Sequence, residues 1–134
     1  MNFLLDTHIA IWYLSGDEKL PLSARQLIYD LDNQIYFSIV SAWEIEIKHI
    51  AHPDKMVCSG SDIAAQCELF GFNELLLRRS HIQMLSTLQR KPNTPSHKDP
   101  FDKMLIAQAK CENMKLITCD SLLSDYCEDC ILYT

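Results

Sequence analysis

The chain has 134 residues, 48% of them hydrophobic and 22% charged, and we expect one globular domain over residues 1–134. The net charge of −6 argues against a broad phosphate-binding face, because non-specific affinity for nucleic acids comes mainly from Lys and Arg. No apolar run approaches the roughly 20 residues that cross a bilayer, and the first residues lack the basic segment of a signal peptide. We therefore expect a cytoplasmic protein with reduced cysteines; zinc binding by Cys127 and Cys130 is the weaker alternative, because no second ligand pair accompanies them.

Short apolar runs predict the strands, and helical periodicity with capping residues predicts the helices. Ser41 and Glu44 fit a capping box, so we expect a helix to begin at about residue 41. Asp99 fits an N-cap with Pro100 at the first helical position, which places Asp102 at the third. In chain order the expected elements are strand 2–6, helix 7–14, helix 23–31, strand 34–38, helix 41–50, helix 62–69, strand 72–77, helix 80–90, a helix from Pro100, strand 115–118, a short helix at 121–126 and strand 130–133.

This alternation of short apolar strands with helices predicts an α/β fold, with an open parallel sheet covered by helices on both faces. Four acids occupy equivalent places in it. Asp6 ends the first strand, and Glu44 lies in the first turn of the helix after the second strand. Asp102 lies in the first turn of the helix that enters the fourth strand, and Asp120 follows that strand. Because right-handed crossovers bring the carboxyl ends of parallel strands to one edge, we expect these acids to converge there.

Capping explains any one of these acids, since a carboxylate near a helix N-terminus is favoured by about 0.3–1 kcal/mol. Four carboxylates at one edge, however, repel one another unless a cation lies between them. Oxygen-only sites rich in carboxylates suit Mg²⁺ or Mn²⁺, and such sites most often serve phosphoryl transfer. The set of acids therefore indicates a hard divalent metal site.

Four segments also carry motifs that occur in a characteristic order: Leu-Leu-Asp-Thr-His at 4–8, Ser-Ala-Trp-Glu-Ile-Glu-Ile-Lys at 41–48, His-Lys-Asp-Pro-Phe-Asp-Lys at 97–103 and Leu-Ile-Thr-Cys-Asp at 116–120. Together, and with Leu-Ile-Ala-Gln-Ala at 105–109, they resemble the PIN-domain ribonucleases of bacterial toxin–antitoxin systems, the VapC type. The resemblance covers almost the whole chain. Each motif alone is weak, whereas the ordered set is specific.

This resemblance implies a PIN-like three-layer α/β/α sandwich with a five-stranded parallel sheet. It implies a Mg²⁺- or Mn²⁺-dependent endoribonuclease that cleaves single-stranded or structured RNA with a metal-activated water, and a partner antitoxin whose tail occupies the active site. We also expect a homodimer. Lys98 and Lys103 stand where arginine is common in the family, so a phosphate contact there is a point charge. The family's catalytic, metal-binding acids map to Asp6, Glu44, Asp102 and Asp120.

Five further residues have open roles. Thr7 and Thr118 flank the acids and are candidates to orient a carboxylate, or are plain strand-end hydroxyls. Lys48 and Lys103 are candidate phosphate contacts, but Lys48 also lies at the spacing of an i,i+4 ion pair with Glu44. Asp99 is assigned to capping, with a supporting role at the site as the lesser alternative.

Two other classes of function compete with the nuclease. The main alternative is a non-catalytic PIN-like binding module that engages a protein partner, which the four intact acids count against. An aspartyl-phosphate phosphatase or receiver domain also places an acid where Asp6 stands, but it requires a further acid next to or two residues after it, where this chain has Thr7 and His8.

Overall fold

A computed structural model describes residues 1–134. The strands are β1 (Asn2–Leu5), β2 (Gln34–Ser38), β3 (Asn73–Leu75), β4 (Lys115–Thr118) and β5 (Ile131–Tyr133). The helices are α1 (Thr7–Ser15), α2 (Leu22–Tyr29), α3 (Ile39–Ala51), α4 (Gly60–Leu69), α5 (Arg79–Met84) and α6 (Pro100–Cys111), with two 3₁₀ helices, η1 (Leu85–Thr87) and η2 (Leu123–Asp125). None of these helices has the length and apolar character that crossing a membrane requires.

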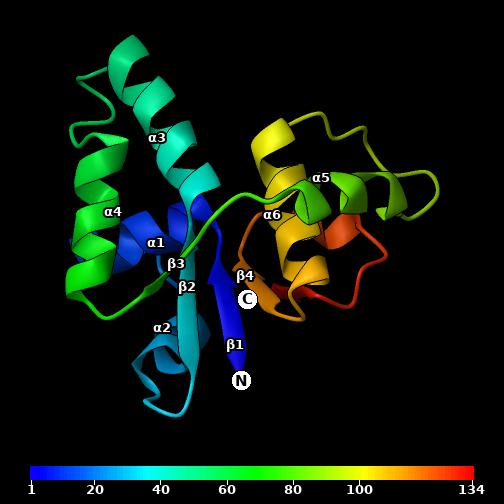
Figure 1. Cartoon of the computed structure of the whole chain (residues 1–134), viewed down its shortest axis with the longest axis horizontal. Helices are drawn as coiled ribbons and strands as arrows, with labels where there is room; N and C mark the ends of the chain where they lie inside the picture. Colours follow the sequence, from blue (N-terminus) through cyan, green and yellow to red (C-terminus); the bar gives the residue numbers. More distant parts are fainter.

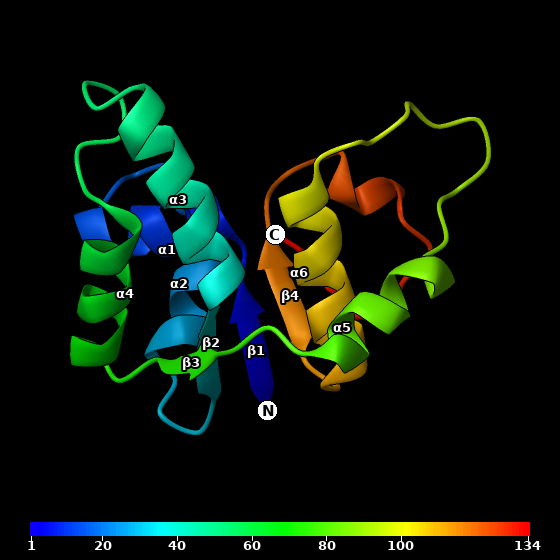
Figure 2. The ribbon, with the colours of Figure 1, turned by 45° about the horizontal axis from the view of Figure 1, so that its top comes forward.

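The strands form one all-parallel sheet in the order β3-β2-β1-β4-β5. β1 is central, with Leu4 opposite Tyr36 of β2 and Leu116 of β4. All five strands point the same way, so their carboxyl ends meet at one edge. There α3 and α6 stand on either side of the tip of β1 (Figures 1 and 2). The predicted five-stranded parallel sheet is confirmed.

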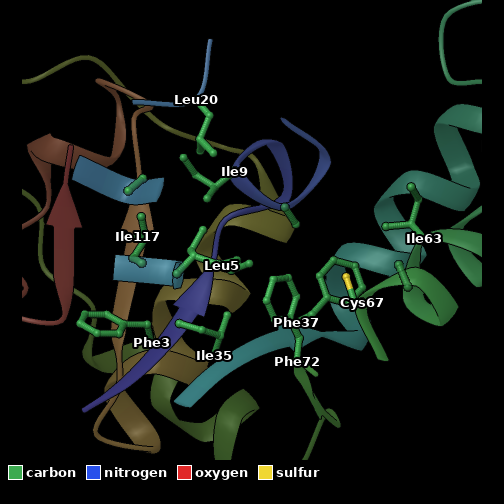
Figure 3. Packing of buried hydrophobic residues seen from close by; sticks show 14 of the residues in the cluster. Phe3, Leu5, Ile9, Leu20, Ile35, Phe37, Ile63, Cys67, Phe72 and Ile117 are labelled. Atoms are coloured by element: carbon green, nitrogen blue, oxygen red, sulfur yellow. The ribbon is translucent and has the colours of Figure 1, made fainter. Parts of the chain in front are cut away.

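Side chains of β1 alternate between two apolar cores, as the strand period of two requires. Phe3 and Leu5 pack with residues of α1, α2 and α4, and Figure 3 shows Ile9, Ile35 and Phe37 in this core. Leu4 belongs to the other core, which α6 dominates through Leu105, Ile106 and Ala109. The sheet thus lies between two helical layers, which completes the α/β/α sandwich.

The predicted start of α3 is wrong. The helix begins at Ile39, and its N-cap is Ser38, whose side chain accepts a hydrogen bond from the Val40 N–H at 3.0 Å. Ser41 and Glu44 are therefore inside the helix and buried rather than forming a capping box. Ile39 and Val40 are β-branched and locally prefer a strand, but packing against the two cores outweighs that preference and the helix includes both residues.

The predicted helix 80–90 is also too long. α5 and η1 end at Thr87, and the chain then becomes extended, because Arg90 pairs antiparallel with Tyr126 and the Gln89 carbonyl accepts the Cys127 N–H at 2.8 Å. These partners lie far away in sequence and replace the local helical hydrogen bonds. β3 is three residues long rather than six, and the short helix at 121–126 is the 3₁₀ turn η2. The strands 34–38 and 115–118 and the start of α6 at Pro100 match the prediction, and the remaining boundaries differ by at most two residues.

Candidate active site

Asp6 follows β1 directly and starts α1 as its N-cap. Its Oδ1 accepts the Thr7 N–H at 2.8 Å, and its Oδ2 accepts the Thr118 hydroxyl at 2.7 Å. The residue is only 4% exposed. Both carboxylate oxygens are thus oriented by the ends of two neighbouring strands, β1 and β4.

Glu44 reaches the same edge from the second turn of α3. Its Oε1 accepts the Thr7 hydroxyl at 2.8 Å, and its Oε2 forms an ion pair with Lys48 at 2.8 Å. Thr7 Oγ1 also lies 2.9 Å from Ser41 Oγ. Because a carboxylate only accepts, Thr7 donates its single hydrogen to Glu44 and accepts from Ser41. Thr7 therefore joins the start of α1 to the buried side of α3.

Asp102 lies in the first turn of α6, as predicted, and Asp99 is the N-cap. Asp99 Oδ1 accepts the Phe101 and Asp102 N–H groups at 2.9 and 3.3 Å. Asp120 follows β4, where its N–H donates to Thr118 Oγ1 and its Oδ1 accepts the Leu122 N–H, both at 3.0 Å. Capping the helix with Asp99 leaves the Asp102 carboxylate free for other contacts.

The four acids are close enough for their charges to affect one another. Burial and, in decreasing order, the charges of Asp6, Asp99, Glu44 and Asp120 together raise the pKa of Asp102 to about 8. Burial is also the main cause of a raised pKa at Asp6, which Glu44 raises further and hydrogen bonds from Thr118 and Thr7 oppose. Carboxylates that are buried and repel one another gain most from a cation, so this donor set fits a hard divalent metal.

Asp102 has one further partner, His97, from the loop before α6. His97 Nε2 lies 3.2 Å from Asp102 Oδ2, and Nδ1 lies 2.9 Å from the Tyr126 hydroxyl. Burial lowers the pKa of His97, and the nearby Arg90 charge lowers it further. The ring is therefore held neutral between an acid of the site and the segment after η2.

The other candidate residues fall into two groups. Thr7, Thr118 and Lys48 contact the acids directly, and the i,i+4 ion pair considered for Lys48 is present. Lys103 forms no ion pair and instead lines an apolar pocket of about 210 Å³ between α3 and α6. The contacts of Ser41 and Tyr126 have no local signal in the sequence, because Ser41 fits a helix cap and nothing nearby links Tyr126 to residue 97.

One tight group of metal-ligating side chains lies away from this edge. Ligand atoms of His81, Cys111 and Glu112 are all within 4.8 Å of one another, whereas no three of the four acids bring one oxygen each that close together. His81 Nδ1, however, accepts the Arg78 N–H at 3.0 Å, so Nε2 carries the proton that it donates to Glu112 at 2.9 Å. That proton occupies the nitrogen lone pair that a metal needs. Both ring nitrogens of His81 already have hydrogen-bond partners, and the group connects α5 to the end of α6.

The family model described as PIN domain matches residues 3–129. The chain belongs to the PIN domain family. Its structure is similar to a crystal structure of VapBC2 from Rickettsia felis bound to a DNA fragment from their promoter, with 14% identity, a TM-score of 0.61, and 100% of this chain and 98% of that chain covered.

It is also similar to VapBC-1 from nontypeable Haemophilus influenzae, with 16% identity, a TM-score of 0.58, and 93% and 94% of the two chains covered. At this identity the two likenesses concern the fold. No curated protein matches the sequence. Family and fold thus agree with the resemblance carried by the four sequence motifs.

Proposed function

We propose that residues 1–134 form one PIN-like domain that acts as a Mg²⁺- or Mn²⁺-dependent endoribonuclease, the toxin of a toxin–antitoxin pair, in the cytoplasm. The observation that carries the proposal is the mutual repulsion of four buried or half-buried acids at the carboxyl edge of a PIN-domain sheet. A carboxyl whose pKa is raised to about 8 by burial and by neighbouring carboxylates is typical of functional sites, and a bound cation would offset the repulsion between these acids.

Asp6, Glu44, Asp102 and Asp120 would hold the metal, as the donor chemistry requires. Asp102 Oδ1 and Asp120 Oδ2 make no hydrogen bond, so they are the oxygens most available to a cation. When bound, a divalent cation polarises the scissile phosphate and lowers the pKa of the attacking water. The Lys48 ammonium, 45% exposed and held by Glu44, is a contact for a substrate phosphate at the rim.

The threonines fix the direction of the acids. Thr118 holds Asp6 and receives the Asp120 N–H, so one hydroxyl sets the relative position of two acids. Thr7 does the same for Glu44 from the start of α1. With the carboxylates oriented in advance, little reorganisation is needed when the substrate binds.

End-labelled RNA incubated with the purified protein tests this function. We expect cleavage in Mg²⁺ or Mn²⁺, none in EDTA, and products with a 5′-phosphate and a 3′-hydroxyl. Asp6→Asn and Asp120→Asn should each lower the rate by about 100-fold or more, since a metal supplies several kcal/mol of charge stabilisation.

Glu18→Gln, at an exposed acid beyond the end of α1, is the matched control and should cleave normally. Products with a 2′,3′-cyclic phosphate, or cleavage that persists in EDTA, would contradict the mechanism. RNA that stays intact with Mn²⁺ present would favour the non-catalytic binding module.

Two protein partners belong to the proposal. A cognate antitoxin is proposed from the resemblance to VapC-type toxins, and the fold is similar to chains of two solved VapBC structures. A homodimer is proposed through α3, whose exposed Trp43, Ile47 and Ile50 share one helical face. That face borders the apolar pocket lined by Trp43, Leu77 and Phe101.

A further inference from the structure

The loop before α6 places a histidine directly behind one acid of the proposed metal site. His97 is 6% exposed although it lies in a surface loop. Its two ring nitrogens each have one partner, Asp102 Oδ2 at 3.2 Å and the Tyr126 hydroxyl at 2.9 Å. A buried histidine with both nitrogens occupied has a fixed ring orientation.

The partners also define which nitrogen carries the hydrogen. An ionised Asp102, the form that ligates a cation, only accepts hydrogen bonds, so His97 Nε2 must donate to it. Nδ1 of the neutral ring then accepts, and the Tyr126 hydroxyl donates. The three groups form one directed chain from Tyr126 through His97 to Asp102.

Tyr126 is itself fixed in place. It is buried, meets the His97 ring edge-to-face at 5.6 Å, and lies under the Arg90 guanidinium, 4.7 Å from the ring centroid. Arg90 in turn binds Thr94 of the same loop at 3.3 Å and is bridged to Tyr126 through the backbone. Contacts between the loop 91–99 and the segment after η2 therefore hold this series of hydrogen bonds in place.

We infer that His97 is a positioning residue for the metal site. By holding Asp102 Oδ2, it fixes the rotamer of the carboxylate and leaves Oδ1 free for the cation. This inference rests on the proposed function. If His97 only held the loop in place, its replacement would lower stability but not metal affinity. If it positions Asp102, its replacement lowers metal affinity.

Titration calorimetry of Mn²⁺ into the full chain, without RNA, separates them. We expect His97→Ala to weaken Mn²⁺ binding by about 10–100-fold, the range for partners that orient metal ligands. His97→Gln keeps an N–H donor at similar reach and should restore most of the affinity. Tyr126→Phe removes one neutral hydrogen bond from the ring and should weaken binding by about 2–10-fold.

Thr94→Val is the matched control, because it loosens the same loop through Arg90 without touching His97. It should lower the melting temperature slightly and leave Mn²⁺ affinity unchanged. Equal Mn²⁺ affinity in the wild type, His97→Ala and Tyr126→Phe would overturn the inference while leaving the metal site intact. Equal losses in Thr94→Val and His97→Ala would also overturn it, since they would show a structural effect. A wild-type protein that binds no Mn²⁺ would instead overturn the proposed function.

Discussion

Asp102 is an acid whose charged form the surrounding protein disfavours. Burial and four neighbouring carboxylates raise its pKa from 3.8 to about 8. The folded chain therefore keeps a proton between about pH 4 and pH 8 that the unfolded chain releases. Its contribution to stability is full below pH 4 and is lost as the pH rises toward about 8.

Asp102→Asn should make the metal-free protein less sensitive to pH over this range. In EDTA, the stability of the variant relative to the wild type should rise from pH 5 to pH 8.5, because the amide carries no charge to repel its neighbours. Urea denaturation at the two pH values measures this. Parallel pH dependence in both proteins, or a loss of several kcal/mol in the variant at both values, would show that Asp102 serves the helix instead.

Thr118 connects two acids through a single hydroxyl. Thr118→Val keeps the shape of the side chain but removes the donor to Asp6, so Mn²⁺ affinity should fall by about 10–100-fold. Thr118→Ser keeps the hydroxyl and should bind nearly as the wild type does. Mn²⁺ affinities that are the same for Val and Ser would contradict the orienting role.

The start of α4 packs tightly against α3 at Gly60. A Cβ at Gly60 would lie 2.0 Å from the Ala42 carbonyl oxygen, a backbone atom that cannot move aside cheaply. Gly60→Ala should therefore destabilise the protein by about 1–3 kcal/mol or more. Ser61→Ala, at the exposed neighbouring position, is the control and should change the stability little. An unfolding midpoint that is unchanged in Gly60→Ala would mean that the two helices can separate locally.

Elements with local signals could be predicted from the sequence, and those decided by distant partners could not. Asp99 and Pro100 define the start of α6 within one turn, and the structure confirms it. The start of α3 was missed because Ser38 is chosen as the cap through burial and through its second contact, with Gln108 seventy residues away. The site shows the same contrast. Asp6 and Asp120 follow strands, and Glu44 and Asp102 lie near helix starts, all of which local sequence patterns predict, whereas the His97–Tyr126 contact joins segments that only the fold brings together.

For the whole molecule, the exposed apolar face of α3 predicts self-association. Light scattering after size exclusion should give twice the chain mass of 15.5 kDa. Ile47→Asp places a charge in the centre of the face and should yield the monomer. Leu31→Asp, at a fully exposed position between α2 and β2, should leave the dimer unchanged. A wild-type monomer at micromolar concentration would contradict the proposed homodimer without touching the metal site.

The central claim is that the carboxyl edge of the sheet binds a divalent cation, and anomalous diffraction from Mn²⁺-soaked crystals tests it most directly. We predict an anomalous peak among Asp6, Glu44, Asp102 and Asp120, at about 2.0–2.3 Å from the carboxylate oxygens that ligate the ion directly, with water filling the other positions, since hard cations bind oxygen at this range and often keep several waters. The peak should disappear in Asp6→Asn crystals. A peak only at His81, Cys111 and Glu112, or no peak at the four acids at saturating Mn²⁺, would contradict the account.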